Sequence, residues 1–359
     1  MSFDFDIAII GAGMAGASLA AQVSGQASVV LLEAEDQPGY HSTGRSAAFW
    51  AESYGGPFIQ PLTTASGAFL KEQGFLKPRG ALHVADLSGI EALAAVEAEF
   101  GDRVAFERLD RPALEGRLPG LRDGWVAALF EPSCADIDVA GLHAFYLASA
   151  RRRGSRLATG AEVGSLSRDG DGWTIESAAG TFRARTIVNA AGAWADRIAA
   201  MAGAAQIGLQ PYRRTLSQLW IDPLAPPDLP LVIDALGRFY FKPEAGGRLW
   251  LSPHDETPCD PCDCAPDELD IAIAIDRLQG IVDWKVQRVE RSWAGLRSFA
   301  PDRRPVYGFD PAAAGFFWCA GQGGFGIQTA PAAAKLAAAL LLAHDPELDP
   351  APYSPHRFG

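Results

Sequence analysis

Residues 6–16 read DIAIIGAGMAG, and this stretch decides the fold class. Its first five residues form a short, continuous apolar run, as expected of a buried parallel strand. Gly11, Gly13 and Gly16 then give the spacing GxGxxG just before an alanine-rich helical segment, and a second apolar run follows at 28–32. The order strand, glycine turn, helix, strand predicts the start of a Rossmann-type α/β domain that binds a dinucleotide.

The three glycines have separate physical roles in such a turn. Gly11 permits the tight turn, Gly13 lets a pyrophosphate approach the backbone, and Gly16 lets helix and strand pack closely. Glu33 ends the second strand, where its carboxylate is placed to accept the ribose hydroxyls and to repel the 2′-phosphate of NADP. This acid makes a glycine turn without any ligand the weaker interpretation.

Two more glycine-bearing strand ends favour FAD over NAD, because an extended FAD is approached by backbone from distant parts of a chain. They are 190–192 and 321–326. Between them, 205–297 alternates strand-like segments with Pro and Gly turns, typical of a mainly antiparallel sheet.

We therefore predict two domains. The FAD-binding domain is discontinuous and comprises 1–50, 137–203 and 298–359. The substrate domain, mainly an antiparallel β-sheet with helices, comprises 51–136 and 204–297.

Charge and hydropathy exclude several classes of partner. The chain has 31 Lys and Arg against 43 Asp and Glu, a net charge of -12, and no basic stripe. Such a surface repels phosphate backbones and anionic lipid, so we expect no nucleic-acid partner. The longest apolar stretch, 332–343, contains Lys335 and is too short to span a membrane. No secretory signal is recognised at the N-terminus, and a cytoplasmic location is expected.

Three of the five cysteines stand close together in Cys259-Asp260-Pro261-Cys262-Asp263-Cys264. A metal clip is one interpretation, but structural zinc usually has four ligands, and His254 would have to supply the fourth. A Pro- and Asp-rich surface loop with reduced thiols is the favoured alternative, so no metal site is predicted.

Together, the motifs resemble the family of FAD-dependent amine and amino-acid oxidoreductases that includes D-amino-acid oxidase, glycine oxidase and sarcosine oxidase. The similarity is strongest to its D-arginine dehydrogenase-like branch. The matching segments follow the family's order over nearly the whole chain: 11–16, 37–48, 135–138, 188–194, 293–299 and 322–328.

The resemblance implies a set of cofactor contacts. The loop 42–48 would run along the flavin and pyrophosphate, Val163 would flank the adenine, and 323–328 would contact the flavin ring. The implied cofactor-binding residues are Gly11, Gly13, Ala15, Gly16, Glu33, Ser42, Thr43, Gly44, Arg45, Ser46, Ala47, Ala48, Val163, Ala191, Gly192, Trp194, Gly323, Gly324, Phe325, Gly326, Ile327 and Gln328.

The resemblance also implies the substrate site. Arg297 matches the arginine that clamps the substrate carboxylate, which a planar guanidinium grips through two parallel hydrogen bonds. Tyr240 and Tyr54 match tyrosines of the pocket, and Arg214 matches a second pocket arginine. Without the resemblance, a domain-interface ion pair is an equally reasonable interpretation of Arg297. A strand tyrosine such as Tyr240 is then more often a core or rim residue than a ligand contact, and the same holds for Tyr54.

At two places this sequence differs from the D-arginine branch, and both differences make the expected substrate pocket less polar. The acid that meets the cationic side chain is missing from 78–82, and Phe49 replaces the pocket histidine. We therefore expect a small or apolar D-amino acid as substrate. The cysteine that tethers flavin in sarcosine-oxidase relatives is missing from 301–305, so the FAD is expected to be non-covalent.

The predicted reaction is hydride transfer from Cα to flavin N5, giving an imino acid that hydrolyses to a keto acid and ammonia. His41 and His83 are expected to be structural, because a neutral amine needs no strong protein base. The electron acceptor is expected to be O2 or a quinone. Oxidation of a secondary amine or a 2-hydroxy acid is the alternative chemistry, and a nucleotide-binding sensor is the alternative that is not an enzyme.

Overall fold

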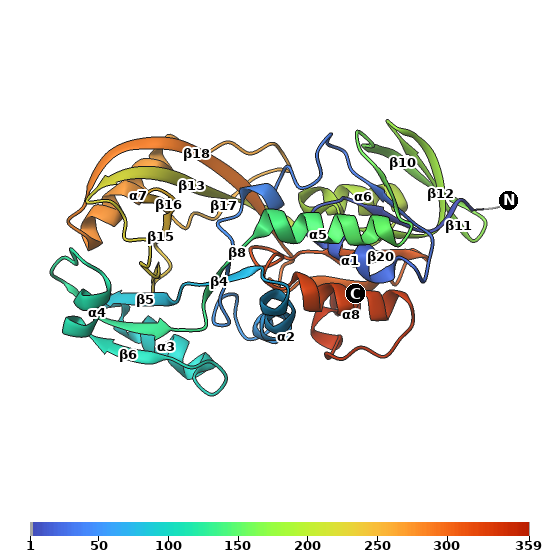
Figure 1. Ribbon diagram of the computed structural model, residues 1–359. Helices are drawn as coiled ribbons and strands as arrows, with labels where there is room; N and C mark the ends of the chain where they lie inside the picture. Colours follow the sequence, from blue (N-terminus) through green and yellow to red (C-terminus); the bar gives the residue numbers. More distant parts are fainter. Residues whose placement is uncertain (1–2, 359) are drawn as a thin grey trace.

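The computed structural model describes residues 3–358, and its two large sheets lie towards opposite ends of an elongated molecule (Figure 1). The first sheet has eight strands, in the order β10-β11-β12-β1-β2-β9, with β20 pairing to β12 and β19 to β20. Its strands are β1 (Phe5–Ile10), β2 (Val29–Leu32), β9 (Arg156–Ala158), β10 (Val163–Asp169), β11 (Gly172–Ser177), β12 (Gly180–Asn189), β19 (Val306–Phe309) and β20 (Phe316–Ala320).

Alternation along β1 explains why helices cover both faces of this sheet. Ile7 and Ile9 join the apolar cluster formed with α1 (Met14–Val23), α5 (Val139–Arg152) and α8 (Ala330–Leu341). Ala8 and Ile10 join the cluster on the other face, which includes α6 (Ala195–Ala202). Because successive side chains of a strand point to opposite faces, a continuous apolar run such as β1 must be buried on both.

Parallel pairing brings the glycine-bearing segments to one edge of the sheet. β1 pairs in parallel with β2 and β12, and β12 pairs in parallel with β20. The turns that follow Ile10, Asn189 and Ala320 therefore leave the sheet at the same edge, where α/β folds place their ligands. Gly11 N–H donates to Leu32 O at 2.7 Å, and Ala190 N–H donates to Ile10 O at 2.9 Å.

The second sheet has nine strands and is antiparallel except where β14 pairs with β5. Its strands are β5 (Ala81–Asp86), β6 (Glu107–Asp110), β7 (Trp125–Glu131), β13 (Gln210–Asp222), β14 (Leu231–Asp234), β15 (Tyr240–Glu244), β16 (Arg248–Ser252), β17 (Thr257–Pro258) and β18 (Lys285–Phe299). The long pair β13 and β18 reaches from this sheet towards the first one (Figure 1). A small third sheet joins β3 (Phe49–Trp50), β8 (Ala135–Ile137) and β4 (Leu76–Pro78).

The remaining helices are α2 (Gln60–Glu72), α3 (Ile90–Phe100), α4 (Arg111–Arg117) and α7 (Glu268–Ile281). Helix α2 packs against α8, and its Leu62 and Leu70 belong to the apolar cluster of the first sheet. The predicted boundaries place α2 in the substrate domain. We propose instead that α2 belongs to the FAD-binding domain, because its apolar side chains are buried there.

The predicted fold class is confirmed: a Rossmann-type α/β domain accompanies a mainly antiparallel second sheet with helices. Helix α1 begins at Met14, inside the glycine motif, and β12 is one continuous strand that pairs with three neighbours. The first half of β12 pairs antiparallel with β11 and its second half parallel with β1 and β20, so no break is needed between them.

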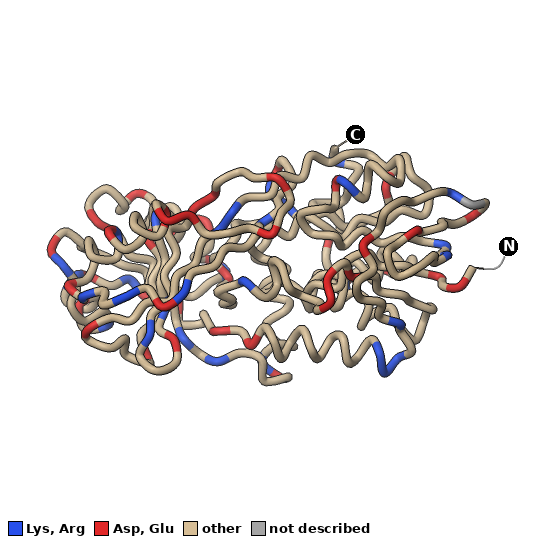
Figure 2. Tube along the Cα trace, turned by 90° about the horizontal axis from the view of Figure 1, so that it is seen from above, with Lys and Arg blue, Asp and Glu red and all other residues tan. Residues whose placement is uncertain are grey.

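Acidic and basic residues are interspersed along the described part of the chain, without a long basic run (Figure 2). Among residues 3–358, no helix is both long and apolar enough to cross a bilayer. The cytoplasmic location stays a prediction.

Gly16 and Gly116 offer a matched test of the close packing between α1 and β1. A Cβ on Gly16 would overlap the carbonyl oxygen of Gly11, whereas a Cβ on the exposed, helical Gly116 meets nothing within 4 Å. We expect Gly16→Ala to destabilise the protein by about 1–3 kcal/mol, since overpacking forces backbone shifts. Gly116→Ala should stabilise it by roughly 0.5–1 kcal/mol, because glycine is unfavourable inside a helix. Thermal unfolding of both variants measures the difference, and equal stability would contradict this packing.

Candidate active site and cofactor cavity

A cavity of about 560 Å³ runs along the edge where the parallel strands end and continues to the second sheet. All the predicted site residues except Gly16, Gly44 and Phe325 lie on its wall. These three residues lie behind the wall. Gly16 packs on Gly11, and Gly44 N–H donates to Gly39 O at 2.8 Å. The ring of Phe325 makes an edge-on contact with the Tyr54 ring, with centroids 5.2 Å apart. We propose that they support the wall without touching the ligand.

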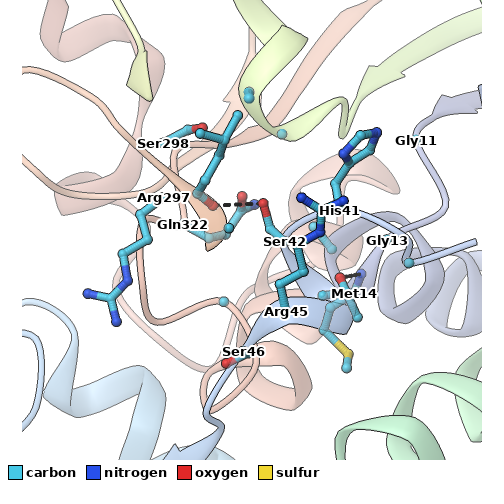
Figure 3. Close-up of a pocket in the computed structure, with 18 of the residues that line it drawn as sticks. Gly11, Gly13, Met14, His41, Ser42, Arg45, Ser46, Arg297, Ser298 and Gln322 are labelled. Carbon is cyan, nitrogen blue, oxygen red and sulfur yellow. Dashed lines mark hydrogen bonds between the residues drawn. The ribbon is translucent and has the colours of Figure 1, made fainter. Parts of the chain in front are cut away.

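The N-terminus of α1 lines one end of the cavity, and its geometry suits the binding of an anion. Gly11 has φ of 99°, and a Cβ there would overlap Ala190 O. A Cβ on Gly13 would stand 3.2 Å from Thr43 Oγ1, an atom that also accepts Met14 N–H at 3.0 Å (Figure 3). Bare backbone and the positive end of a helix dipole fit a pyrophosphate.

Glu33 lies on the same wall and is only 9% exposed. Its Oε2 accepts Ala12 N–H at 2.9 Å and its Oε1 accepts Glu35 N–H at 3.1 Å. These bonds fix the carboxylate at the rim of the glycine turn, and each oxygen retains a lone pair for a further donor. That position suits the predicted ribose contact, which stays a prediction.

His143 on α5 supports the glycine turn and was missed from the sequence. Its Nε2 donates to Ala12 O at 2.8 Å, and a Cβ on Gly39 would stand 2.9 Å from its ring. Burial lowers the pKa of His143, so the imidazole that bonds to the glycine turn is neutral. The sequence shows only a histidine in a helix, and nothing in it indicates that α5 lies under residues 12 and 39.

The loop that contains 42–48 connects the glycine turn to β18. Ser42 Oγ donates to Leu296 O at 2.7 Å, and Arg45 Nη1 donates to Ala294 O at 3.1 Å. Trp293 Nε1 donates to Arg45 O at 3.0 Å. Figure 3 shows Ser42, Arg45 and Ser46 on this loop, close to Gly13 and Met14. The loop therefore connects the two sheets through hydrogen bonds.

Gln328 has the same connecting role near the other end of the cavity. It is 2% exposed, and its amide donates to Tyr54 O at 2.9 Å and to Thr63 Oγ1 at 3.0 Å. Its Oε1 accepts Ala51 N–H at 3.3 Å. Gln328 thus fixes the segment that carries Tyr54, and Gly323 to Gln328 reaches the cavity where the two sheets meet.

The four predicted substrate residues gather at this far end. Arg297 extends away from Gly11 and His41 (Figure 3), and its Cζ lies 5.9 Å from the centroid of the Tyr54 ring. The Phe49 ring packs against Tyr54 at 4.9 Å and against Tyr240 at 6.0 Å. A Cβ on Gly324 would stand 2.7 Å from the Arg297 Cζ, so any side chain at this position would displace the guanidinium.

Arg214 is the second guanidinium at this end and is 3% exposed. Its Nε donates to Asp255 O at 2.7 Å and its Nη2 to Glu256 at 3.3 Å, but its buried Nη1 has no partner. Burial lowers the pKa of Arg214, and the positive charge of Arg297 lowers it further. Tyr54 Oη is also buried without a hydrogen-bond partner. Two like charges with unfilled donors favour the binding of an anion.

The histidines near the site are held by protein contacts. His41 Nε2 pairs with Glu35 at 2.8 Å, and His83 Nε2 lies 3.3 Å from the buried Glu131. His254 packs beside Tyr240 with ring centroids 5.6 Å apart. Burial, with the charges of Arg214 and Arg297, lowers the pKa of His254 to about 3, so its ring is neutral.

Comparisons with known proteins agree with this architecture. The family model of the DAO family, described as FAD dependent oxidoreductase, matches residues 6–340. A glycine oxidase from Geobacillus kaustophilus is 26% identical over 99% of this chain and 97% of its own length. A glycine oxidase from Pseudomonas aeruginosa is 30% identical over 66% of this chain and 64% of its own length.

Solved structures show the same fold. The glycine oxidase from Geobacillus kaustophilus superimposes with a TM-score of 0.87 at 24% identity, covering 98% of each chain. The L-proline dehydrogenase from P. horikoshii gives a TM-score of 0.88 at 22% identity, covering 100% of this chain and 98% of the other. The resemblance to the D-arginine dehydrogenase-like branch stays a prediction.

The family match spans both sheets and every segment that lines the cavity, so the predicted cofactor, FAD, and the predicted enzyme class are confirmed. The chain belongs to the DAO family of FAD-dependent oxidoreductases.

Proposed function

We propose that this enzyme oxidises the amine-bearing carbon of an α-amino acid, and that its preferred substrates are D-amino acids with small or apolar side chains. The observation that carries the proposal is a pair of guanidiniums, the buried Arg214 and the partly buried Arg297, at one end of the FAD cavity. Arg297 forms no ion pair with a carboxylate of the described chain, so its charge is available to a ligand.

The lining of the cavity fits FAD in one orientation. Glu33 and Val163 would hold the adenosine end, the turn at Gly11 and Gly13 would hold the pyrophosphate, and the segment 323–328 would hold the ring end. This orientation supports a substrate site at Arg297, since the reactive ring must face the substrate.

The residues of this site bind and orient the substrate. Arg297 would grip the carboxylate through two parallel hydrogen bonds, which fixes the direction of the Cα–H bond. Burial raises the pKa of Tyr240, so its phenol stays protonated and can donate a further bond. Phe49 and Leu216 supply apolar wall that excludes water.

Bound FAD would supply the acceptor for the hydride that leaves Cα. The imino acid that leaves the site hydrolyses to a keto acid and ammonia. Because the amine reacts in its neutral form, the site needs no strong base, in agreement with a His254 that stays neutral.

The charge of the lining supports a small or apolar side chain. Its acidic residues, Glu33, Glu35 and Glu162, belong to the adenosine end as proposed above. Arg79, which stands in the segment where the D-arginine branch has its acid, forms an ion pair with Asp136. A cationic side chain would therefore find no carboxylate at the substrate end.

A secondary or primary amine of the glycine type is the second candidate, because glycine oxidases are among the relatives. We propose O2 or a quinone as the electron acceptor and a non-covalent FAD. Oxidation of a 2-hydroxy acid remains the alternative chemistry at the same arginines.

An anaerobic substrate panel tests the reaction and its stereochemistry. Flavin bleaching should be fast with D-alanine, D-leucine or D-phenylalanine and slow with their L-forms, D-arginine and D-lactate. Faster bleaching by glycine or sarcosine would favour the second candidate. Much faster bleaching by D-arginine would contradict the apolar site.

Arg297→Met tests the carboxylate clamp. Removing one partner of a buried charge-assisted contact should lower kcat/KM by roughly 100-fold or more, mainly through KM. Arg291→Met is the matched control, because Arg291 lies on the same strand, is exposed and stacks on Trp293 outside the cavity. An unchanged kcat/KM in Arg297→Met would remove Arg297 from the substrate site.

Acid precipitation tests how the flavin is held. The segment 301–305 has no cysteine, so the yellow colour should stay entirely in the supernatant after the protein is precipitated. Flavin absorbance retained in the washed pellet would show a covalent bond.

A further inference from the structure

Three cysteine thiols meet outside the cavity, in the loop between β17 and α7. The sulfur atoms of Cys259, Cys262 and Cys264 all lie within 4.8 Å of one another. All three are free thiols; Cys264 is buried, Cys259 is partly buried and Cys262 is exposed. The sequence favoured a surface loop with reduced thiols and no metal site, whereas the fold brings the three sulfur atoms close together.

The protein holds both ends of this thiol cluster in place. Cys259 N–H donates to Pro211 O at 3.1 Å, and Gln210 Nε2 donates to Cys259 O at 3.3 Å. At the other end, Arg45 Nη1 donates to Cys264 O at 3.0 Å, and Arg45 also pairs with Asp263. The convergence is therefore built by contacts with β13 and with the loop 42–48.

The spacing of the sulfurs suits a thiophilic metal ion. Three sulfurs at about 2.3 Å from a tetrahedral Zn²⁺ stand roughly 3.8 Å apart. The present separations, at most 4.8 Å, need only small side-chain rotations to close on an ion. Soft thiolates select Zn²⁺ or Cu(I) over hard cations such as Mg²⁺.

The charge of a loaded site can be partly balanced by the protein. Three adjacent thiolates need a central cation. Arg45 bonds to the carbonyl of Cys264, and Arg213 pairs across the sheet with Thr257, two residues before Cys259, so both guanidiniums stand near the loop.

We propose that Cys259, Cys262 and Cys264 bind one Zn²⁺ ion through three thiolates, with water at the fourth position. Binding releases the three thiol protons and leaves a net charge of about -1, which faces Arg213 and Arg45. His254 is not the fourth ligand, because neither of its ring nitrogens belongs to the group of ligand atoms that meet at the cluster. The exposure of Cys262 gives water access to the ion.

The site would have a structural consequence for the cofactor cavity. A metal ion would fix the backbone of Cys264, whose carbonyl anchors Arg45. Arg45 lies on the wall of the cavity, between the glycine turn and β18. Zinc binding would thus stabilise the connection between the two sheets.

Zinc titration of the reduced holoenzyme tests the proposal. The enzyme, treated with chelator and then desalted, is titrated with Zn²⁺ against a chromophoric chelator, and bound zinc is counted by elemental analysis. We expect one Zn²⁺ per chain and the release of three protons in weakly buffered solution. Cobalt in place of zinc should give thiolate-to-metal charge-transfer absorption.

Two cysteine variants separate the thiol cluster from the rest of the protein. Cys262→Ser, at an exposed position that does not disturb packing, should weaken zinc binding at least 100-fold. Cys134→Ala is the matched control: it removes a fully buried cysteine outside the cluster and should bind zinc as the parent does. Circular dichroism and flavin content confirm that both variants are folded.

Three results would overturn the proposal. They are less than stoichiometric zinc uptake by the reduced enzyme, equal zinc affinity in Cys262→Ser and the parent, and a disulfide within the cluster of the freshly purified enzyme that prevents metal binding. None of these depends on the identity of the oxidised substrate.

Discussion

The backbone contact between Gly11 and Ala190 is the constraint on which the rest of the structure depends. Gly11 has a left-handed conformation and no side chain, and any Cβ would overlap the carbonyl of Ala190. This contact lets the ends of β1 and β12 approach each other, and it directs the N-terminus of α1 into the cavity. Without it, the helix dipole and the bare backbone would not face a common ligand.

Two connections extend this edge of the sheet into an active site. The loop 42–48 bonds to β18 through Ser42 and Arg45, and Gln328 bonds to the segment that carries Tyr54. Both connections cross from the first sheet to residues at the proposed substrate end of the cavity. They place the guanidinium of Arg297 in one cavity with the glycine turn, although most of the chain separates the two in sequence.

Placing the buried Arg214 and the partly buried Arg297 side by side costs free energy, because each guanidinium loses hydration and repels the other. Arg214 is partly compensated by Asp255 and Glu256, while Arg297 has mainly aromatic neighbours. We propose that a carboxylate bound at this end supplies the missing hydrogen bonds and so offsets this cost. Proteins keep such unsatisfied polar groups mostly where function needs them.

The sequence by itself determined the local features, because these depend on residue order over short distances. The run before Gly11, the GxGxxG spacing and Glu33 predicted the βαβ unit and the dinucleotide, and the family resemblance indicated Arg297, Arg214, Tyr54 and Tyr240. Tertiary structure alone decided which distant segments meet. His143 under the glycine turn, α2 against α8, and the three sulfur atoms at one point depend on packing across more than 100 residues or on loop anchoring, and no periodicity records such contacts.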